Sequence, residues 1–194
     1  MAVPHPLTLA DIPLRSDDLD ALSDDLERRE LIAGELIVAP SLLVSHQDSV
    51  GRLYDLFGGW RGIPGIDKPY LAPLDVRLSD RDTVQPDLFF VRWDRLDRFV
   101  EDRRFEGPPD IVVEVVSPSS RRLDRVRKLA LYKRAGIPEY WLVDPAAASI
   151  EVLALVGDAA QRHALATGDA EVTSRVLPGL SVRAASVFAD ELPR

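Results

Sequence analysis

Short runs of apolar and β-branched residues dominate the chain from residue 71 onward and are typical of β-strands. We expect strands over residues 71–78, 87–91, 110–116, 139–144, 149–155 and 162–167. Between the third and fourth runs, residues 121–136 consist of good helix formers and end at Gly136, a typical C-terminal stop. This strand–helix–strand succession predicts a crossover unit, which is right-handed when its two strands are parallel.

The beginning of the chain shows helical spacing instead. Leu19, Leu22 and Leu26 recur at helical spacing behind Ser16, which is a good N-cap residue. We therefore expect an amphipathic helix over residues 16–29.

Three further elements are expected before residue 71. Residues 30–40 carry a glycine between apolar flanks, which predicts two short strands joined by a turn. Residues 41–57 are predicted to form a second helix, whose inner stripe would consist of Val44, Val50, Leu53, Leu56 and Phe57. Glycine and proline in residues 58–65 predict a loop.

Together these elements predict an α/β or α+β fold with a mixed central β-sheet flanked by helices. The length of 194 residues suits one domain with a substantial core. Residues 1–15 hold three prolines and are expected to be irregular, while residues 149–194 would add strands at the C-terminal end.

Composition and charge narrow the class of protein. Hydrophobic residues make up 46% of the chain and charged residues 29%, as in ordinary globular proteins. No cysteine is present, and neither a signal peptide nor a membrane-spanning run of about 20 apolar residues is recognisable, so we expect a cytoplasmic protein with no membrane contact. The net charge of −8 argues against a broad affinity for nucleic acid, although basic residues gather in 121–128.

Two acidic residues interrupt apolar runs and suggest chemistry. Glu114 stands in the middle of PDIVVEVVS, and Asp87 stands at the start of DLFFV. An ionised carboxylate is costly to bury unless it is paired or binds a metal ion. If the two strands pair, the two acids can lie side by side, where carboxylate oxygens suit Mg²⁺ or Mn²⁺.

The helix predicted over 121–136 adds a cation to this pair. Asp124, Lys128 and Tyr132 follow each other at intervals of four and lie along one helical face. Lys128 could reach the end of the sheet and stabilise a metal-activated hydroxide or phosphate charge. Two acids, a lysine and a divalent ion form a constellation for phosphodiester hydrolysis.

Each of these residues also has an ordinary structural interpretation. Glu114 could be a strand-edge acid paired with Arg127 or Lys128, and Asp87 could be a turn residue. His46 on the second helix is interpreted as a hydrogen-bonded or partly exposed histidine and not as a metal ligand.

A longer pattern joins these pieces. The segments QPDLFFV and PPDIVVEVVSPSSRRLDRVRKLALYKRAGIPEYWLVDP, together with RRELIAGELIVAPS and the following His46, resemble the Uma2 family, also called DUF820. This family is placed in the PD-(D/E)xK nuclease superfamily. The resemblance implies a restriction-endonuclease-like core, built on a mixed four-stranded sheet, and Mg²⁺-dependent phosphodiester cleavage.

The resemblance also assigns residues. Asp87 matches the acid of the PD motif and Glu114 the acid of the (D/E)xK motif, which makes both the implied metal ligands. The lysine of that motif should stand at position 116, where this chain has Val116. Lys128 on the next helix is the natural replacement, and Glu35 or Glu30 is the candidate for an additional acid.

Further residues are expected near the site on the same grounds. Tyr132 and Ser117 match family positions, and Arg121, Arg122 and Arg125 could hold phosphates that flank the reacting bond. The first hypothesis is therefore a metal-dependent endonuclease acting on DNA, as a homodimer. A degenerate nuclease fold that serves as a dimerisation or nucleic-acid-binding module is the alternative, motivated by Val116, and an RNA-directed or nucleotide-directed hydrolase is a third possibility.

Overall fold

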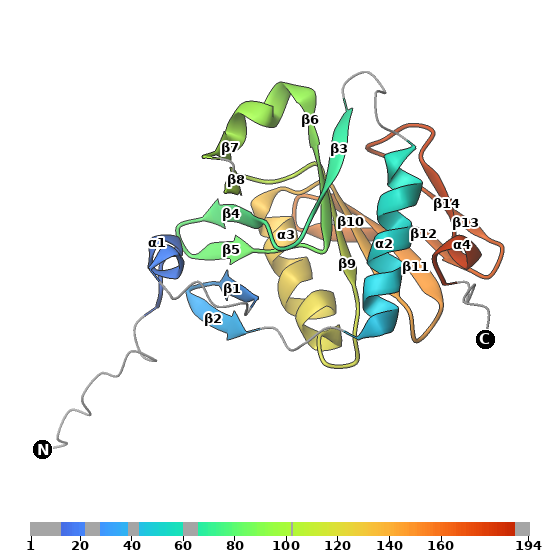
Figure 1. Cartoon of the computed structure of the whole chain (residues 1–194), viewed down its shortest axis with the longest axis horizontal. Coiled ribbons are helices and arrows are strands. Elements are labelled where there is room, and N and C mark those ends of the chain that lie inside the picture. Colours follow the sequence, from blue (N-terminus) through green and yellow to red (C-terminus); the bar gives the residue numbers. More distant parts are fainter. Residues whose placement is uncertain (1–12, 22–27, 39–42, 60–65, 102, 189–194) are drawn as a thin grey trace, which may run out of the picture.

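The computed structural model describes residues 13–21, 28–38, 43–59, 66–101 and 103–188. Within these ranges, β-strands form two six-stranded sheets and one two-stranded ladder. Helices cover both faces of one six-stranded sheet, which we call the central sheet, as Figure 1 shows. The predicted mixture of helices around a mixed central sheet is thereby confirmed.

The central sheet has the strand order β12-β11-β10-β9-β6-β3. Its strands are β3 (Ile66–Leu71), β6 (Leu88–Arg92), β9 (Ile111–Val115), β10 (Glu139–Asp144), β11 (Ser149–Val156) and β12 (Ala159–Thr167). Strands β9 and β10 run parallel, and the other neighbouring pairs are antiparallel. The helix between β9 and β10 makes this parallel pair the predicted crossover unit.

A second sheet has the order β2-β1-β5-β4-β8-β7. Its strands are β1 (Arg29–Ile32), β2 (Glu35–Val38), β4 (Asp75–Ser79), β5 (Asp82–Val84), β7 (Phe99–Val100) and β8 (Arg104–Glu106). The turn between β1 and β2 places both Ala33 and Gly34 at positive φ, 55° and 81°, a conformation that favours glycine. The predicted glycine turn is confirmed.

The helices lie on opposite faces of the central sheet (Figure 1). Helices α2 (Val44–Gly58) and α4 (Ala184–Phe188) pack on one face, next to the ladder of β13 (Glu171–Thr173) and β14 (Ser181–Arg183). The other face is covered by α3 (Leu129–Ala135) and by the second sheet. Shorter elements are α1 (Ser16–Asp20) and a 3₁₀ helix, Trp93–Arg98.

Strand β9 lies between two apolar clusters because its side chains alternate between the two faces of the sheet. Ile111, Val113 and Val115 belong to the cluster under α2, whereas Val112 and Val116 belong to the cluster under α3. Glu114 has the same parity as Val112 and Val116, so it points toward the α3 face. The one acid in this strand therefore lies on the face that the next helix covers.

Several predicted boundaries in the first half are wrong. The helix expected over 16–29 ends at Asp20, and Arg29 is already in β1; residues 22–27 lie outside the described residues. Arg15, not Ser16, is the N-cap, because the Ser16 hydroxyl instead donates to the Ser79 carbonyl at 2.9 Å.

The run 71–78 is also not one strand. Strand β3 ends at Leu71 and β4 starts at Asp75, and Pro73, which has no backbone N–H to donate, lies between them. Strands β5, β7 and β8 were not predicted, because two or three residues are too few for a recognisable alternation.

The two long helices differ from expectation in detail. In α2, Leu53 and Phe57 are buried, but Val44 and Leu56 are exposed, and the inner face also holds His46. Helix 121–136 contains a π-helical segment, Leu123–Lys128, that continues directly into α3. Gly136 ends α3 at φ 78°, as predicted.

Candidate active site

Pairing of β6 with β9 brings the two predicted acids to the same end of the sheet. Leu88 is opposite Val113 and Phe89 is opposite Val112, so Asp87 and Glu114 are the next facing positions. Both side chains are buried, with 3% and 2% exposure. Asp87 also accepts a hydrogen bond from the Val115 amide at 2.7 Å, which fixes its carboxylate against β9.

The helix after β9 supplies a cation to Glu114. The Lys128 ammonium lies 2.9 Å from Glu114 Oε1, and the Tyr132 hydroxyl donates to the same oxygen at 2.6 Å. Asp124, one turn earlier, lies 4.0 Å from the ammonium. Lys128 and Tyr132 are both fully buried, so their polar atoms are committed to this cluster.

The apolar surroundings of Val116 make a lysine unfavourable at this strand position. Its side chain is 3% exposed and belongs to the apolar cluster that includes Leu131 of α3. A lysine there would have to bury its ammonium in apolar surroundings. Lys128 instead approaches Glu114 from the helix and needs no space within that cluster.

Glu30 of β1 completes the cluster, while Glu35 does not. Glu30 Oε1 lies 2.9 Å from the Lys128 ammonium and accepts the Gln85 amide at 2.8 Å. Glu35 is exposed on β2 and pairs with Arg127 at 2.8 Å, away from the buried carboxylates. Of the two acids considered from the sequence, the structure thus places Glu30 in the cluster and Glu35 outside it.

Two members of the cluster were missed by sequence reasoning. The Arg28 guanidinium lies 2.7 Å from Asp87 Oδ1 and 3.9 Å from Glu114 Oε2, and it also donates to the Gln85 carbonyl. His46 Nε2 lies 3.1 Å from Asp87 Oδ2, and its Nδ1 is buried without a hydrogen-bond partner among the described residues. The signal that could have found them is the family pattern, because RRELIAGELIVAPS begins with Arg28 and is followed by His46.

These side chains lie at the bottom of a cleft of about 700 Å³. Its polar lining includes Arg28, Glu30, His46, Asp87, Glu114, Asp124 and Lys128. Ser117 also lines the cleft, where its hydroxyl bonds with Ser119 and Ser120 in the turn after β9. Ser117 is therefore near the cluster but in contact with neither Glu114 nor Lys128 by any hydrogen bond of the described residues.

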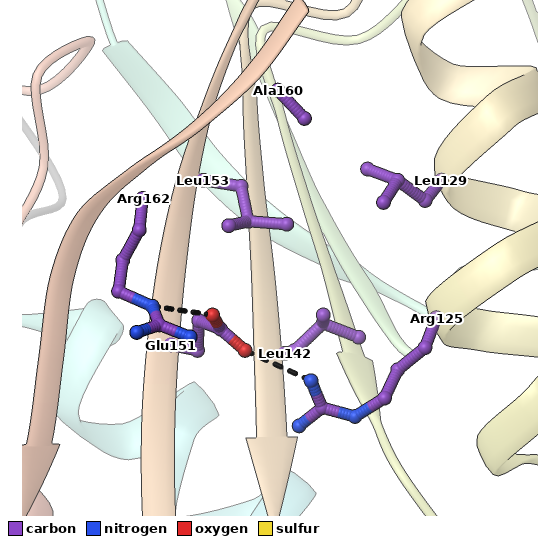
Figure 2. A pocket seen from close by; sticks show the side chains of 7 residues that line it. All are labelled: Arg125, Leu129, Leu142, Glu151, Leu153, Ala160 and Arg162. Carbon is purple, nitrogen blue, oxygen red and sulfur yellow. Dashed lines mark hydrogen bonds and ion pairs between the residues drawn. The ribbon is translucent and has the colours of Figure 1, made fainter.

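The three predicted phosphate-binding arginines do not act as one group. Arg121 lies 2.9 Å from Asp144, and Arg125 lies 2.9 Å from Glu151. Figure 2 shows Arg125 reaching Glu151 from the helix while Arg162 reaches it from the sheet, around a separate hollow of about 280 Å³. Neither arginine lines the cleft, because their partners lie on β10 and β11, beyond the strand that carries Glu114.

Only Arg122 of the three lines the cleft. Its side chain is exposed, and no ion pair forms between it and any of the described residues. Arg127, which the sequence did not single out as a phosphate ligand, also lines the cleft and carries the ion pair to Glu35. The cleft mouth is therefore basic, and its floor is rich in acids.

Burial and charge shift the pKa values of the floor in opposite directions. Burial raises the pKa of Glu114; the charge of Lys128 opposes this, the charge of Asp87 adds to it, and the pKa reaches about 8. Burial would likewise raise the pKa of Asp87, but the His46 hydrogen bond and the Arg28 charge outweigh it and lower the pKa below its usual range. Burial alone would lower the pKa of Lys128, but the charges of Glu114 and Glu30 outweigh this effect. The pKa of Lys128 is therefore raised above its usual value, and the ammonium remains charged.

The floor contains more acids than cations. Glu30, Asp87, Glu114 and Asp124 are buried carboxyl groups, and Arg28 and Lys128 are the cations that contact them. Full ionisation would leave two negative charges unbalanced. Protons can balance them, as the raised pKa values of Glu114 and Asp124 indicate, and so can one divalent cation.

The donor set suits a hard cation with few protein ligands. Nowhere in the described ranges do three or more His, Asp or Glu side chains form a group that could hold a metal ion together. Asp87 and Glu114 offer two carboxylates that line one cleft. Magnesium is usually held by one or two carboxylates, with waters and substrate phosphate as its remaining ligands, so the residues fit such an ion.

The fold of this chain is also found in a protein of known structure. A crystal structure from Anabaena variabilis ATCC 29413, described as a putative nuclease belonging to DUF820, superposes with a TM-score of 0.75 at 19% sequence identity. The superposition covers 91% of this chain and 98% of that one, so the two proteins share a fold. No curated protein matches the chain.

No helix within the described ranges is long and apolar enough to cross a bilayer. The model of the Uma2 family, described as "Putative restriction endonuclease", matches residues 16–186. This match spans both sheets, the crossover helix and every member of the buried cluster. The chain therefore belongs to the Uma2 family.

Proposed function

We propose that this protein is a Mg²⁺-dependent or Mn²⁺-dependent endonuclease that hydrolyses phosphodiester bonds, with DNA as its substrate. The observation that carries the proposal is the charge imbalance in the cleft floor, where four buried carboxyl groups meet two cations. Such an excess of buried acids is balanced either by protons or by a bound cation. A divalent cation would supply the balancing charge at the place where a phosphate enters from the basic mouth.

Asp87 and Glu114 would hold the cation. When bound, a divalent ion lowers the pKa of a coordinated water and neutralises charge on the phosphate. Asp87 is suited to this role because its pKa is depressed and its carboxylate is fixed by the Val115 amide. Tyr132 would orient Glu114, since its hydroxyl donates to one carboxylate oxygen and leaves Oε2 for other ligands.

Lys128 would stabilise negative charge on the attacking oxygen and on the phosphate in the transition state. Its ammonium is held by Glu114 and Glu30, each at 2.9 Å, and it stays protonated because both acids raise its pKa. A preorganised charge in a buried site contributes more to rate than the same charge in water. Glu30 is in this account a positioning residue that acts through Lys128.

Arg28 would exchange partners during binding. In the structure it neutralises Asp87 at 2.7 Å, and its Nε atom is buried without a partner among the described residues. A cation held by Asp87 would repel the guanidinium. Released from Asp87, Arg28 would be available to the substrate phosphate, which guanidinium groups bind in a bidentate manner.

The test is cleavage of plasmid, linear duplex DNA, single-stranded DNA and RNA with Mg²⁺ or Mn²⁺. Wild type is compared with Asp87→Asn, Glu114→Gln and Lys128→Met, and Glu151→Gln serves as a control that removes a buried charge outside the cleft. We expect metal-dependent cutting by wild type and Glu151→Gln, and a loss of about 10²-fold or more in the three cleft variants. Equal cutting by all variants would contradict this site.

The finer parts of the proposal have separate tests. A preference for RNA in the same assay would replace DNA as the substrate. No cutting by pure wild type with either metal would favour the degenerate fold that only binds nucleic acid. The homodimer and the cytoplasmic location remain predictions; the mass of the particle in solution, from light scattering, tests the first.

A further inference from the structure

Exposed apolar side chains gather at the mouth of the cleft. Nine large apolar side chains are exposed among the described residues, and three of them, Val38, Leu43 and Val126, line this one cleft. Their exposures are 49%, 55% and 59%, and Val44, next to Leu43, is 75% exposed. Single exposed apolar residues are ordinary, but a group around a polar cleft marks a binding surface.

The three side chains, which we call the apolar lip, come from three separate elements. Val38 ends β2, Leu43 directly precedes α2, and Val126 lies on the π-helical segment that also carries Lys128. The lip thus brings exposed apolar side chains from three elements to the cleft whose buried residues form the acidic floor.

Basic side chains interleave with the lip. Arg122 and Arg127 lie on either side of Val126 in the same helix, and both line the cleft. The mouth therefore combines positive charge with apolar surface, whereas the floor is acidic. Such a surface matches a ligand with an anionic backbone and exposed apolar faces.

An unstacked nucleotide is a ligand of this kind. In an intact duplex the faces of the bases are covered by stacking, so the apolar lip would meet only phosphates, sugars and polar base edges. In a single strand or a distorted duplex the base faces are free and can stack on apolar side chains, while the phosphates meet arginines. A concave cleft of about 700 Å³ also resembles a ligand pocket more than the flat contact of two protein subunits.

We propose that the cleft selects unstacked nucleotides, in single-stranded or locally distorted DNA, with base faces on the lip formed by Val38, Leu43 and Val126. Arg122 and Arg127 hold the adjacent phosphates. The inference rests on the proposed nuclease function and specifies the substrate class of the same site.

The experiment measures binding of three DNA probes labelled with 2-aminopurine, whose fluorescence rises on unstacking. The probes are a single strand, its perfect duplex and the duplex with a central mismatch bubble, each with Ca²⁺ to limit turnover. The expected result is binding of the single strand and the bubble about tenfold tighter than the duplex, since burial of one Val or Leu side chain under a base face contributes about this factor. The fluorescence of the bound probes should rise.

Matched variants assign the effect to the lip. Val126→Ser and Leu43→Ser should each weaken binding of the single strand and the bubble about tenfold and leave duplex binding unchanged. Val156→Ser is the control, because Val156 is 63% exposed at the end of β11 and does not line the cleft. It should bind all three probes as wild type does.

Three outcomes would overturn the inference, and they can be told apart. Cleavage and binding of duplex and single strand at equal strength, unchanged in Val126→Ser, would leave the nuclease function standing without this selectivity. A monomer in Val126→Ser, where wild type is a dimer, with DNA binding intact, would identify the lip as a subunit contact. No binding of any nucleic acid and no cleavage would refute the inference together with the proposed function.

Discussion

Two charged clusters lie next to each other on the face of the central sheet that the crossover helix covers, and only one of them has the character of a reactive site. In the inner cluster Lys128 enters the cleft floor and contacts Glu30 and Glu114. In the outer cluster Arg121 pairs with Asp144, and Arg125 pairs with Glu151, as Figure 2 shows for Arg125. Both clusters are made of acids and bases, so the presence of ion pairs alone does not distinguish them.

The difference lies in the balance of charge. In the outer cluster three arginines face two acids, and Glu151 receives one hydrogen bond from Arg125 at 2.9 Å and one from Arg162 at 2.7 Å. Partial burial would raise the pKa of Glu151, but these hydrogen bonds outweigh it and lower the pKa below its usual value. In the cleft, by contrast, the pKa of Glu114 is raised to about 8.

This contrast teaches how to recognise the functional cluster. A satisfied network lowers the pKa of its acids and stabilises the fold, whereas a site with excess acid raises a pKa and can take up a proton or a cation. The outer cluster connects the helix to β10 and β11, whereas the inner cluster has the raised carboxyl pKa that is typical of a reactive site.

The largest effect is expected from Lys128→Met. It removes a buried cation and leaves Glu30 and Glu114 without their shared partner, which should lower the free energy of unfolding by about 3–5 kcal/mol and abolish cleavage. Urea unfolding and the cleavage assay measure the two effects. Lys133→Met, which removes a half-buried lysine of the same helix that bonds the Asp158 carbonyl, is the control and should change either quantity little. A Lys128→Met protein as stable as wild type would contradict a stabilising ion pair between Lys128 and Glu30.

The second prediction concerns pH. Glu114 keeps its proton up to about pH 8, so a cation has to displace that proton. Below this pH, Mn²⁺ affinity should therefore increase about tenfold for each unit by which the pH is raised. Isothermal titration calorimetry between pH 6 and 8 should also detect proton release in buffers of different ionisation enthalpy. Glu114→Gln should remove the pH dependence, and Glu151→Gln should preserve it.

Stability should respond to pH with opposite sign in the two clusters. The pKa of Glu114 is higher in the folded state than its usual value of 4.5, so the folded state holds the proton and the free energy of unfolding falls as pH rises from about 4.5 to about 8. The pKa of Glu151 is lowered, so its contribution is present above its usual value and is lost as pH falls through the folded pKa. Unfolding curves of the two Gln variants test both signs when they extend from below pH 4.5, where Glu151 acts, up to about pH 8, where Glu114 acts; a Glu114→Gln variant that keeps the fall of stability above pH 4.5 would contradict the comparison.

A smaller effect is expected from Tyr132→Phe. The variant loses the 2.6 Å hydrogen bond to Glu114, which should cost about 1.5–3 kcal/mol of stability because the acceptor is a carboxylate. The pH midpoint of Mn²⁺ binding should move upward, since the charged form of Glu114 loses a donor. Tyr140→Phe is the matched control: its hydroxyl donates at 3.2 Å to the Asp124 backbone carbonyl, so a cost of about 1 kcal/mol and no shift of that midpoint are expected.

The smallest effect is expected from Arg125→Met. Arg125 is 34% exposed, and an ion pair of this kind contributes about 1 kcal/mol or less. Stability by urea unfolding should change by no more than this, and cleavage should persist. If cleavage were lost while stability stayed constant, Arg125 would contact substrate, as the sequence first suggested, and the outer cluster would belong to the site.

The sequence determined the local elements of this protein and the acids that interrupt them. Alternating and apolar runs located β6, β9, β10 and β11, and the Gly136 stop located the end of α3, because these signals depend on neighbouring residues. The isolated acids at 87 and 114 were recognisable for the same reason. Short strands such as β5 and the break at Pro73 were not predicted, because too few residues carry the pattern of a strand there.

The tertiary structure alone decided the membership of the site. Lys128 meets Glu30 across 98 positions of the chain, and Arg28 meets Asp87 across 59, so no local pattern could choose Glu30 over Glu35 or find Arg28. The rotation of the helix likewise turned Arg121 and Arg125 to the sheet and left Arg122 at the cleft. Sequence patterns fix which residues are unusual, but pairing of distant strands fixes which of them share a charge.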